Sequence, residues 1–448
     1  MTSPLVFFWA MLSLPTADLP AQTAQVENVP AQVAEEETPS PLPLAEEEET
    51  LAPVPLGGEE VEGVEENTPP LPLPPPPPPP PSAPPAEAAR IRFQMGKGVL
   101  LSSADEAFDL RVRAMAQLRL AFTPEGEDTN VFSARSVRLL LEGRAFEKRL
   151  VLRVQTGLSP DEMEGGSGLL DAWVSWTFGK SLTLRLGQQR VFYDLSGGLA
   201  RDGNHGITRE SASREFGMGR DIGIALFTED LFGWKEWLAC RVGVYSGKGR
   251  NRLDTRSGFL AMARLTLRPF GYFDDTVEGD VERLANPRLA VGLSAAYNSH
   301  ITRAGGHNGR HFDSADFPAM DASYWNADAM FKWKGLYVAG QYSRRVTTRA
   351  FVENDTERVW GRSGHGYAFK VGGMLGARWE LLGRFGQQFG IGRTEPALLE
   401  QLKNEFAVGL NHYFIGHALK AQVEYSARFT QAKVLYQDAL RLQLQAVF

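Results

Sequence analysis

Apolar and polar residues alternate with a period of two along most of the chain from Asp109 onward. Between residues 110 and 122 the even positions are apolar, whereas the odd positions include Arg111, Arg113 and Arg119. Successive side chains of a β-strand point to opposite faces, so this pattern gives one apolar face and one wet face. A helix with the same pattern would be apolar all round. The periodicity therefore predicts β-strands.

The same alternation recurs in segments of about ten residues, a length that suits strands tilted across a bilayer. Sixteen such segments can be placed, and an even number is typical of barrels in the bacterial outer membrane. Their predicted bounds are 109–121, 135–146, 149–157, 168–178, 181–190, 219–228, 235–246, 258–268, 287–298, 322–333, 335–347, 365–375, 377–388, 402–413, 416–429 and 437–448.

The connections between these segments alternate in length. Short ones, such as 147–148 and 334–335, are typical of tight hairpins, and long ones, such as 191–218 and 299–321, contain Gly, Asp, Asn and Arg. One rim of short turns and one rim of long loops is the layout of an outer-membrane barrel. A soluble barrel of this size would enclose a lumen too wide for side chains to fill. We therefore expect an all-β fold, a transmembrane antiparallel β-barrel of about sixteen strands over residues 105–448, with a lipid-facing exterior and a wet lumen.

The last predicted strand, 437–448, ends on the aromatic residue Phe448. Its apolar residues share one parity, and Arg441 and two glutamines share the other. Alone, this segment also fits an edge strand of a soluble β-sandwich. In a closed barrel it must pair antiparallel with segment 109–121, which removes both sheet edges. Phe448 is then expected to be a membrane-insertion signal, read by the barrel-assembly machinery, and an aromatic anchor at the membrane interface.

The amino-terminal region has a different composition. Residues 1–24 contain a short apolar core and are expected to form a signal peptide, although no Lys or Arg precedes the core. Residues 25–90 are rich in Pro and Glu, and 19 of the 28 prolines lie between Pro30 and Pro85. Such a segment buries too little apolar surface to offset its ordering entropy, so we expect it to be disordered, in the periplasm. Its role is open between a spacer that contacts the cell wall and an inert solvated tail.

Charge is divided unevenly between the two parts. Residues 1–89 contain 15 acidic residues and no Lys or Arg. The remainder therefore has 39 of the 54 acidic residues against all 47 Lys and Arg, a net charge of +8. Thirty-six of these cations are Arg, whose planar set of donors suits carboxylate and phosphate groups.

Little in the sequence points to catalysis or to a cofactor. Cys240 is the only cysteine, which excludes an intramolecular disulfide and a Cys-based zinc cluster. His307 and His311 have metal-ligand spacing only on a helix, which their Gly-rich setting disfavours. No Gly-x-Ser-x-Gly elbow supports a nucleophile at Ser196. We expect no enzyme activity, no metal and no cofactor, and no nucleic-acid binding because the arginines lack an aromatic stacking platform.

The longest interior connection, 191–218, is expected to fold inward and narrow the lumen. Five arginines lie in it or beside it: Arg190, Arg201, Arg209, Arg214 and Arg220. Six more have lumen parity on the predicted strands: Arg111, Arg113, Arg138, Arg144, Arg153 and Arg185. Fixed positive charges in a narrow aqueous pore attract small anionic solutes and repel cations. The alternative for each arginine is an ion pair, with Glu142 or Asp171 for example, that only holds the wall together.

Several motifs, taken in order, resemble the phosphate-selective porin O and P family. A strand ends in Gly187-Gln-Gln-Arg190, a long loop carries Arg209-Glu-Ser211, and Arg220-Asp-Ile-Gly223 opens the next strand. Segments 132–144, 409–413 and 440–448 resemble the family's arginine-rich second strand, its late Gly-x-Asn-x-Tyr strand and its ending. The resemblance covers about residues 105–448.

This resemblance implies a sixteen-stranded porin in the outer membrane of a Gram-negative bacterium, assembled as a homotrimer, with the third extracellular loop narrowing the pore. The function it implies is passive diffusion of small solutes with a preference for anions, including phosphate. The alternative, from another functional class, is a structural barrel that anchors the Pro-rich tail in the periplasm and conducts little or nothing.

Overall fold

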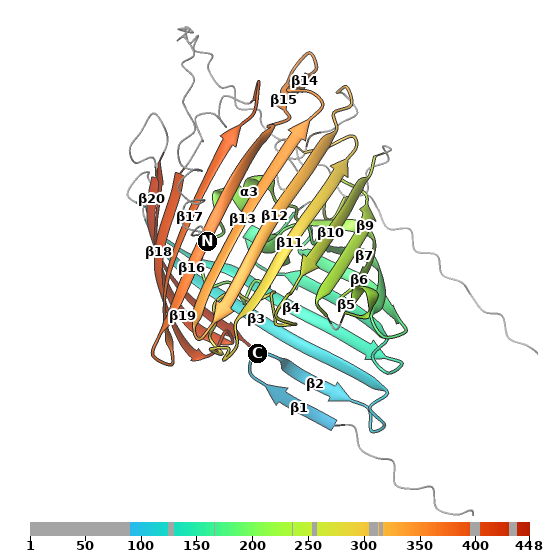
Figure 1. Ribbon diagram of the computed structural model, residues 1–448, viewed down its shortest axis with the longest axis vertical. Coiled ribbons are helices and arrows are strands. Elements are labelled where there is room, and N and C mark those ends of the chain that lie inside the picture. The colour runs from blue at the N-terminus through green and yellow to red at the C-terminus, as the bar shows by residue number, and fades with distance from the viewer. Residues whose placement is uncertain are drawn as a thin grey trace, which may run out of the picture. The chain divides into compact units, whose positions relative to one another are not determined.

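The computed structural model describes residues 90–123, 130–164, 166–234, 236–252, 258–303, 312, 317–394, 404–429 and 437–448. The predicted signal peptide and almost all of the Pro/Glu-rich segment lie outside these described residues. Residues 81–448 belong to one compact unit, and its described part is a β-barrel (Figure 1).

Sixteen strands form a closed antiparallel ring within a larger 18-stranded sheet. Each strand of the ring corresponds to one predicted segment, with bounds that differ by only a few residues. The strands are β3 (Phe108–Phe122), β4 (Asn130–Ala145), β5 (Leu150–Gly157), β6 (Leu169–Phe178), β7 (Leu182–Arg190), β8 (Arg220–Thr228), β9 (Leu238–Tyr245), β10 (Leu260–Leu267), β11 (Arg288–Asn298), β12 (Ala322–Trp333), β13 (Leu336–Thr347), β16 (Gly364–Leu375), β17 (Trp379–Gly390), β18 (Asn404–Ile415), β19 (Leu419–Phe429) and β20 (Gln437–Val447).

The first and last strands of the ring close it. Strand β20 pairs antiparallel with β3, from Leu440 opposite Phe122 to Val447 opposite Met115. The pairing continues through Phe448, whose backbone N–H donates to the Ala114 carbonyl at 2.8 Å. The predicted partnership between the carboxy-terminal segment and the first barrel strand is therefore confirmed.

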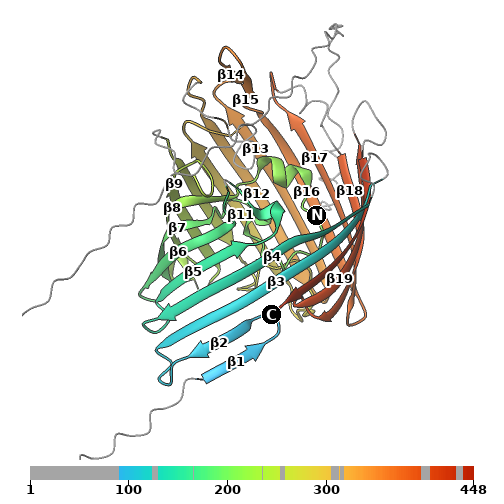
Figure 2. The same cartoon turned by 180° about the vertical axis from the view of Figure 1, so that it is seen from behind.

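A hairpin that the alternation pattern did not reveal extends the sheet at the same place. Strands β1 (Arg90–Gln94) and β2 (Gly98–Ser102) pair with each other, and β2 pairs with the first residues of β3 (Figure 2). Strand β2 thus occupies the edge of β3 that β20 leaves open. Gly96 N–H donates to the Val447 carbonyl at 2.9 Å, which joins the hairpin turn to the end of β20.

The two faces of the barrel differ in the sense expected for a membrane protein. Leu118 is 39% exposed on the outer face, whereas its neighbours Gln117 and Arg119, on the lumen face, are 4% and 9% exposed. Apolar residues outside and polar residues inside suit a barrel with lipid around it and polar contents. No helix in the described residues is long and apolar enough to cross a membrane.

Most of the connections on one rim are short. Turns such as 146–149, 334–335 and 376–378 join neighbouring strands directly, as predicted. The connection between β10 and β11, 268–287, lies on this same rim but is long, and several of its residues, including Glu278, are buried. The expectation of a rim with only short turns was wrong at this position. On the opposite rim, one long connection carries a small hairpin of β14 (Phe351–Glu353) and β15 (Arg358–Trp360), and another carries η1 (Pro160–Glu162).

Candidate functional site

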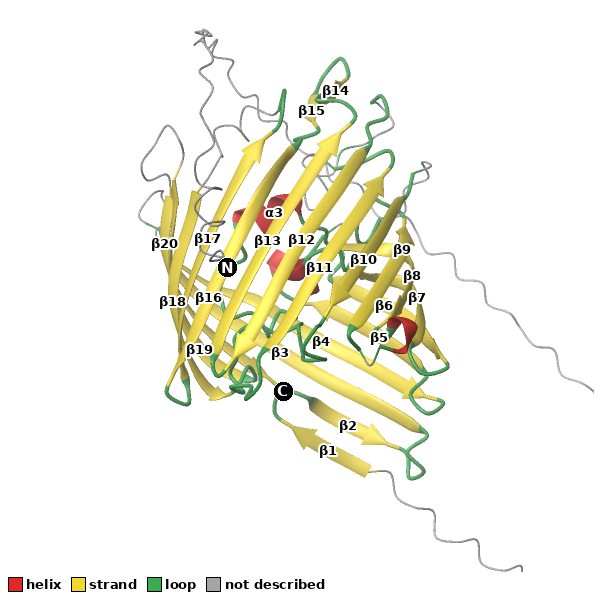
Figure 3. Cartoon of the chain, viewed as in Figure 1, coloured by secondary structure: helices red, strands yellow, loops and turns green. Residues whose placement is uncertain are grey.

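The connection between β7 and β8, residues 191–219, lies inside the barrel as predicted. We call it the inner loop. It carries two short helices, α2 (Leu195–Gly198) and α3 (Ser211–Phe216), which are drawn in red within the ring of strands in Figure 3.

Carboxylates on the barrel wall hold the inner loop by its backbone. Backbone N–H groups of the loop donate to Asp328 on β12, to Glu405 on β18 and to Glu424 on β19, at 3.2, 3.1 and 2.8 Å. The donors are Leu195, Ser211 and Ile207, respectively. Hydrogen bonds to an ionised acceptor are stronger than neutral ones, so these three carboxylates fix the path of the loop. These three carboxylates are buried between the wall and the inner loop, where they accept the backbone hydrogen bonds.

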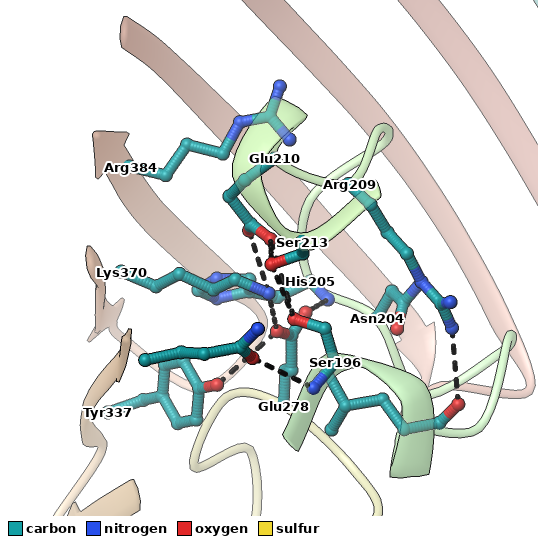
Figure 4. A network of polar contacts seen from close by, with 12 residues as sticks. Ser196, Asn204, His205, Arg209, Glu210, Ser213, Glu278, Tyr337, Lys370 and Arg384 are labelled. Carbon is teal, nitrogen blue, oxygen red and sulfur yellow. Dashed lines mark hydrogen bonds and ion pairs between the residues drawn. The ribbon is translucent and has the colours of Figure 1, made fainter. Parts of the chain in front are cut away.

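A buried ion network connects the inner loop to the long connection 268–287. Lys370 Nζ on β16 lies 2.8 Å from Glu210 of the inner loop and 2.5 Å from Glu278 of that connection (Figure 4). Glu278 also accepts a hydrogen bond from the His205 backbone N–H at 2.9 Å. Burial raises the pKa of a carboxyl group, but the charges and hydrogen bonds of Lys370 and His205 together outweigh it, so the pKa of Glu278 lies well below its ordinary value.

The connection 268–287 also meets the inner loop through the backbone. Ala200 N–H donates to the Thr276 carbonyl at 2.8 Å, and Glu278 N–H donates to the Gly203 carbonyl at 2.8 Å. Lys332 Nζ on the wall donates to the Val277 carbonyl at 2.6 Å. Two segments that enter from opposite rims therefore meet in the lumen. Only the first of them was predicted to do so.

A cavity of about 610 Å³ lies beside the inner loop. We call it the arginine cavity, because five arginines line it together with three acids. The arginines are Arg135, Arg201, Arg209, Arg214 and Arg428, and the acids are Asp161, Asp194 and Glu215. A second cavity of about 120 Å³ shares four of these arginines and adds Arg119 of β3.

Three arginines of the inner loop reach the cavity without a carboxylate partner among the described residues. Arg201 Nε donates to the neutral Gln117 side chain at 3.3 Å, and Arg209 donates to the Leu199 carbonyl at 3.5 Å. The Arg214 side chain makes no hydrogen bond or ion pair within the described part of the chain. Most of their guanidinium donors are therefore free to meet a solute.

One acid of the arginine cavity has an unusual pKa. Asp194 caps the start of α2, where its Oδ1 accepts a hydrogen bond from the Gly197 N–H. Its Oδ2 is buried and has no hydrogen-bond partner among the described residues. Burial raises the pKa of Asp194 to about 6, so its charge changes within the ordinary working range of pH.

The other two predicted arginines of this region support the base of the loop. Arg190 donates to the carbonyl groups of Gly197, at 3.5 Å, and Leu199. Arg220 forms an ion pair with Asp171 on β6 at 2.9 Å. These two side chains do not line the arginine cavity.

Most of the predicted wall arginines face the lumen but have acid partners. Arg111, Arg144 and Arg153 all lie within ion-pair distance of Glu142, which is 2% exposed. Arg138 donates to Glu162 at 2.7 Å, and Arg113 pairs with Asp202 of the inner loop. Arg185 instead lies between two aromatic rings, of Trp173 at 3.9 Å and of Phe227 at 4.8 Å.

Arg135 was not among the predicted lumen arginines because the alternation of inward and outward side chains shifts by one residue beside it. Gln117 of β3 lies opposite Ser136, but the next residue, Leu118, lies opposite Ala134, so Arg135 is the extra residue of a β-bulge. A bulge re-aims side chains and breaks the period of two. The parity that places Arg138 in the lumen would put Arg135 on the lipid side, yet it lines the arginine cavity.

Comparison with known proteins supports the fold. No protein-family model and no curated protein matches the sequence. OmpF of Salmonella typhi, in complex with daunomycin, has a TM-score of 0.54 at 13% identity, over 77% of this chain and 99% of that one. Two structures of OmpT, an outer membrane protein of Vibrio cholerae, each cover 76% of this chain and 100% of their own. The form lacking loop L8 has a TM-score of 0.51 at 10% identity, and the trimer form 0.50 at 9%. At these identities the likeness establishes the fold, a closed antiparallel β-barrel similar to outer-membrane porins.

Proposed function

We propose that the protein is an outer-membrane porin, a water-filled channel for passive diffusion of small solutes with a preference for anions. The observation that carries this proposal is the arginine cavity, in which the side chains of Arg201, Arg209 and Arg214 form no ion pair or hydrogen bond with a carboxylate among the described residues. Fixed charges inside low-dielectric walls raise the local concentration of ions of opposite sign.

The distribution of acids supports the same preference. Asp328, Glu405 and Glu424 accept backbone hydrogen bonds from the inner loop and are buried at the wall behind it. Their charges are offset there by neighbouring arginines, such as Arg264 at 2.7 Å from Asp328. The loop thus separates a neutralised wall from a cavity with an excess of positive charge.

In the O and P family that the sequence resembles, the phosphate-specific members use lysines at the constriction. The positions of the lumen lysines in this chain favour a general anion channel over one specific for phosphate. Lys332 and Lys420 donate to backbone carbonyls, and Lys370 is held between two carboxylates. None of these three lines the arginine cavity. Arginine alone can still bind phosphate through paired N–H donors, so the resemblance to the O and P family leads us to include phosphate among the permeant anions.

Location and assembly follow from this proposal. We place the barrel in the outer membrane of a Gram-negative bacterium, with the Pro/Glu-rich segment in the periplasm and three copies in a homotrimer. The solved OmpT structure described as a trimer form supports the last point by analogy.

The proposal is tested by charge-neutralising variants in planar bilayers. The double variant Arg209→Ala with Arg214→Ala should shift the reversal potential under a salt gradient toward the value of a non-selective pore. The matched control is Arg349→Ala with Arg358→Ala, which removes two exposed charges from an outer connection. Selectivity that is unchanged in the first pair, or equally changed in both, would place the filter elsewhere.

The rival function, a structural barrel without conductance, is favoured by one observation. The inner loop and the connection 268–287 both enter the lumen and bond to each other there. A barrel plugged by these segments would give no conductance steps in a bilayer, whereas an open porin gives discrete steps.

A further inference from the structure

Cations and aromatic rings alternate along the lumen wall on five consecutive strands, β5 to β9. The row is Arg153, Trp173, Arg185, Phe227 and Arg241. The distances from each guanidinium carbon to the adjacent ring centre are 5.1, 3.9, 4.8 and 5.7 Å in that order. All fall within the range of a favourable cation–π contact.

Strand register builds this row. Arg153 lies directly opposite Trp173 across β5 and β6, and Phe227 lies directly opposite Arg241 across β8 and β9. A guanidinium that stacks on a ring uses its flat face. Its N–H donors point outward in the plane of the group, so they remain available for an anion.

A small cavity of about 120 Å³ opens at the middle of the row. Arg185 and Arg241 line it together with the rings of Phe192, Phe227 and Tyr245 and the Met262 side chain. Its lining is therefore mainly aromatic and apolar, with two cations and the neutral polar residues Gln189 and Thr276. This composition differs from that of the arginine cavity, in which charged and polar residues predominate.

Two glycines allow Tyr245 to lie against the wall beside this cavity. A Cβ at Gly243 would be 2.6 Å from the Tyr245 ring. A Cβ at Gly223 would be 2.7 Å from the Tyr245 ring and closer still to the Val244 carbonyl oxygen. Atoms do not approach so closely, so a side chain at Gly243 would displace the Tyr245 ring, and one at Gly223 would displace the strand backbone as well. The absence of both side chains keeps the space open.

Arg185 has no acid partner among the described residues, unlike its neighbours. Arg153 pairs with Glu142, and Arg241 pairs with Glu229 at 2.5 Å. Arg185 makes only its two ring contacts, and its Nε is buried without a hydrogen-bond partner. A half-buried cation with unused donors, at the edge of a mainly apolar cavity, is a binding element for an anion with an apolar body.

We propose that this cavity binds a small flat aromatic carboxylate of the size of benzoate. The carboxylate would accept from the in-plane donors of Arg185, and the ring would lie among Phe192, Phe227 and Tyr245. An apolar protein cavity of about 150 Å³ is known to hold benzene. This cavity is smaller, at about 120 Å³, so a single ring is the most that it can hold, and the carboxylate must lie at its edge beside Arg185. This site lies on the wall, apart from the arginine cavity, so benzoate binding here does not depend on whether the open channel prefers anions.

The test is equilibrium binding of benzoate to the refolded full-length protein in detergent, followed by calorimetry. Benzoate should bind saturably, while acetate, which lacks the ring, and 2-naphthoate, which exceeds the cavity, should bind at least about tenfold more weakly. Arg185→Gln and Gly243→Val should each weaken benzoate binding by about tenfold or more. The matched control, Arg441→Gln, removes a lumen charge from the distant strand β20 and should leave benzoate affinity within about twofold.

Each outcome decides the proposal. Equal binding of acetate and benzoate, or equal losses in Arg185→Gln and Arg441→Gln, would mean that general lumen charge holds the anion and would overturn the site. Loss in Arg185→Gln with none in Gly243→Val would contradict the role of the cavity. Gel mobility before and after heating shows whether each variant has folded. If Gly243→Val does not fold, Phe227→Leu serves as a second cavity variant, because it removes an aromatic ring from the lining but keeps an apolar side chain.

Discussion

Glu278 accepts a hydrogen bond at 2.9 Å from the backbone N–H of His205, and this contact joins two connections that enter the barrel from opposite rims. His205 belongs to the inner loop, and Glu278 belongs to the connection 268–287. Lys370 holds Glu278 in place from the wall. The arginine cavity therefore depends on a support that lies outside the inner loop itself.

Replacing Lys370 with Met should loosen both inner segments. The change leaves Glu210 and Glu278 buried without their shared cation, and breaking a buried ion pair costs about 3–5 kcal/mol. We expect a lower temperature of heat-induced unfolding and noisier single-channel currents. Lys334→Met, in an exposed turn, is the control. If Lys370→Met matches the wild type in both measurements, the network does not support the loop.

The selectivity should depend on pH through Asp194. Its pKa is raised to about 6, so the group is ionised above this pH and neutral below it. Protonation removes one negative charge from the arginine cavity, and anion preference should therefore rise as pH falls through about 6. Asp194→Asn should show the low-pH reversal potential at every pH. If the reversal potential of Asp194→Asn still changes with pH as much as that of the wild type, another group is responsible for the pH dependence.

Glu142 should neutralise the positive charge of three neighbouring arginines on the lumen wall. Its side chain lies within ion-pair distance of Arg111, Arg144 and Arg153. Glu142→Gln releases three cations into the lumen, so we expect stronger anion preference together with a loss of stability of about 3–5 kcal/mol. Glu353→Gln, which breaks an exposed pair with Arg358, is the control and should change neither quantity appreciably. Unchanged reversal potential in Glu142→Gln would show that these arginines do not act on the permeant ions.

Deleting Phe448 should impair assembly more than conductance. Its backbone forms two hydrogen bonds with Ala114, at 2.8 and 2.9 Å, and the residue, which directly follows β20, is 48% exposed. We expect a reduced yield of folded barrel in the membrane, measured by heat-shifted gel mobility, and near-normal conductance in the molecules that do assemble. Phe448→Tyr keeps an aromatic end and should assemble normally. Normal yield after deletion would remove the insertion role of this residue.

Alternation was sufficient to predict the barrel because each strand has one face toward lipid and one toward the lumen. It placed Arg111, Arg113 and Arg138 correctly, since their strands keep a regular period there. It failed at Arg135, where a bulge shifts the phase. No local pattern indicated that the connection 268–287 turns inward, because its contacts with Ala200 and Gly203 join positions far apart in the sequence.

Ion pairing was the second property that the sequence left open. Arg144 and Arg214 look alike as lumen arginines, yet Arg144 pairs with Glu142 and Arg214 has no acid partner in the described residues. The difference arises because Glu142 shares a strand with Arg144, whereas Arg214 projects from a helix into a cavity. Such distinctions depend on tertiary placement and not on residue type.

The most direct test of the central claim is the reversal potential of the wild-type protein in a planar bilayer under a potassium chloride gradient. The arginine cavity predicts discrete conductance steps and a reversal potential with the sign of chloride preference. A reversal potential with the sign of potassium preference, or no conductance at all, would contradict it.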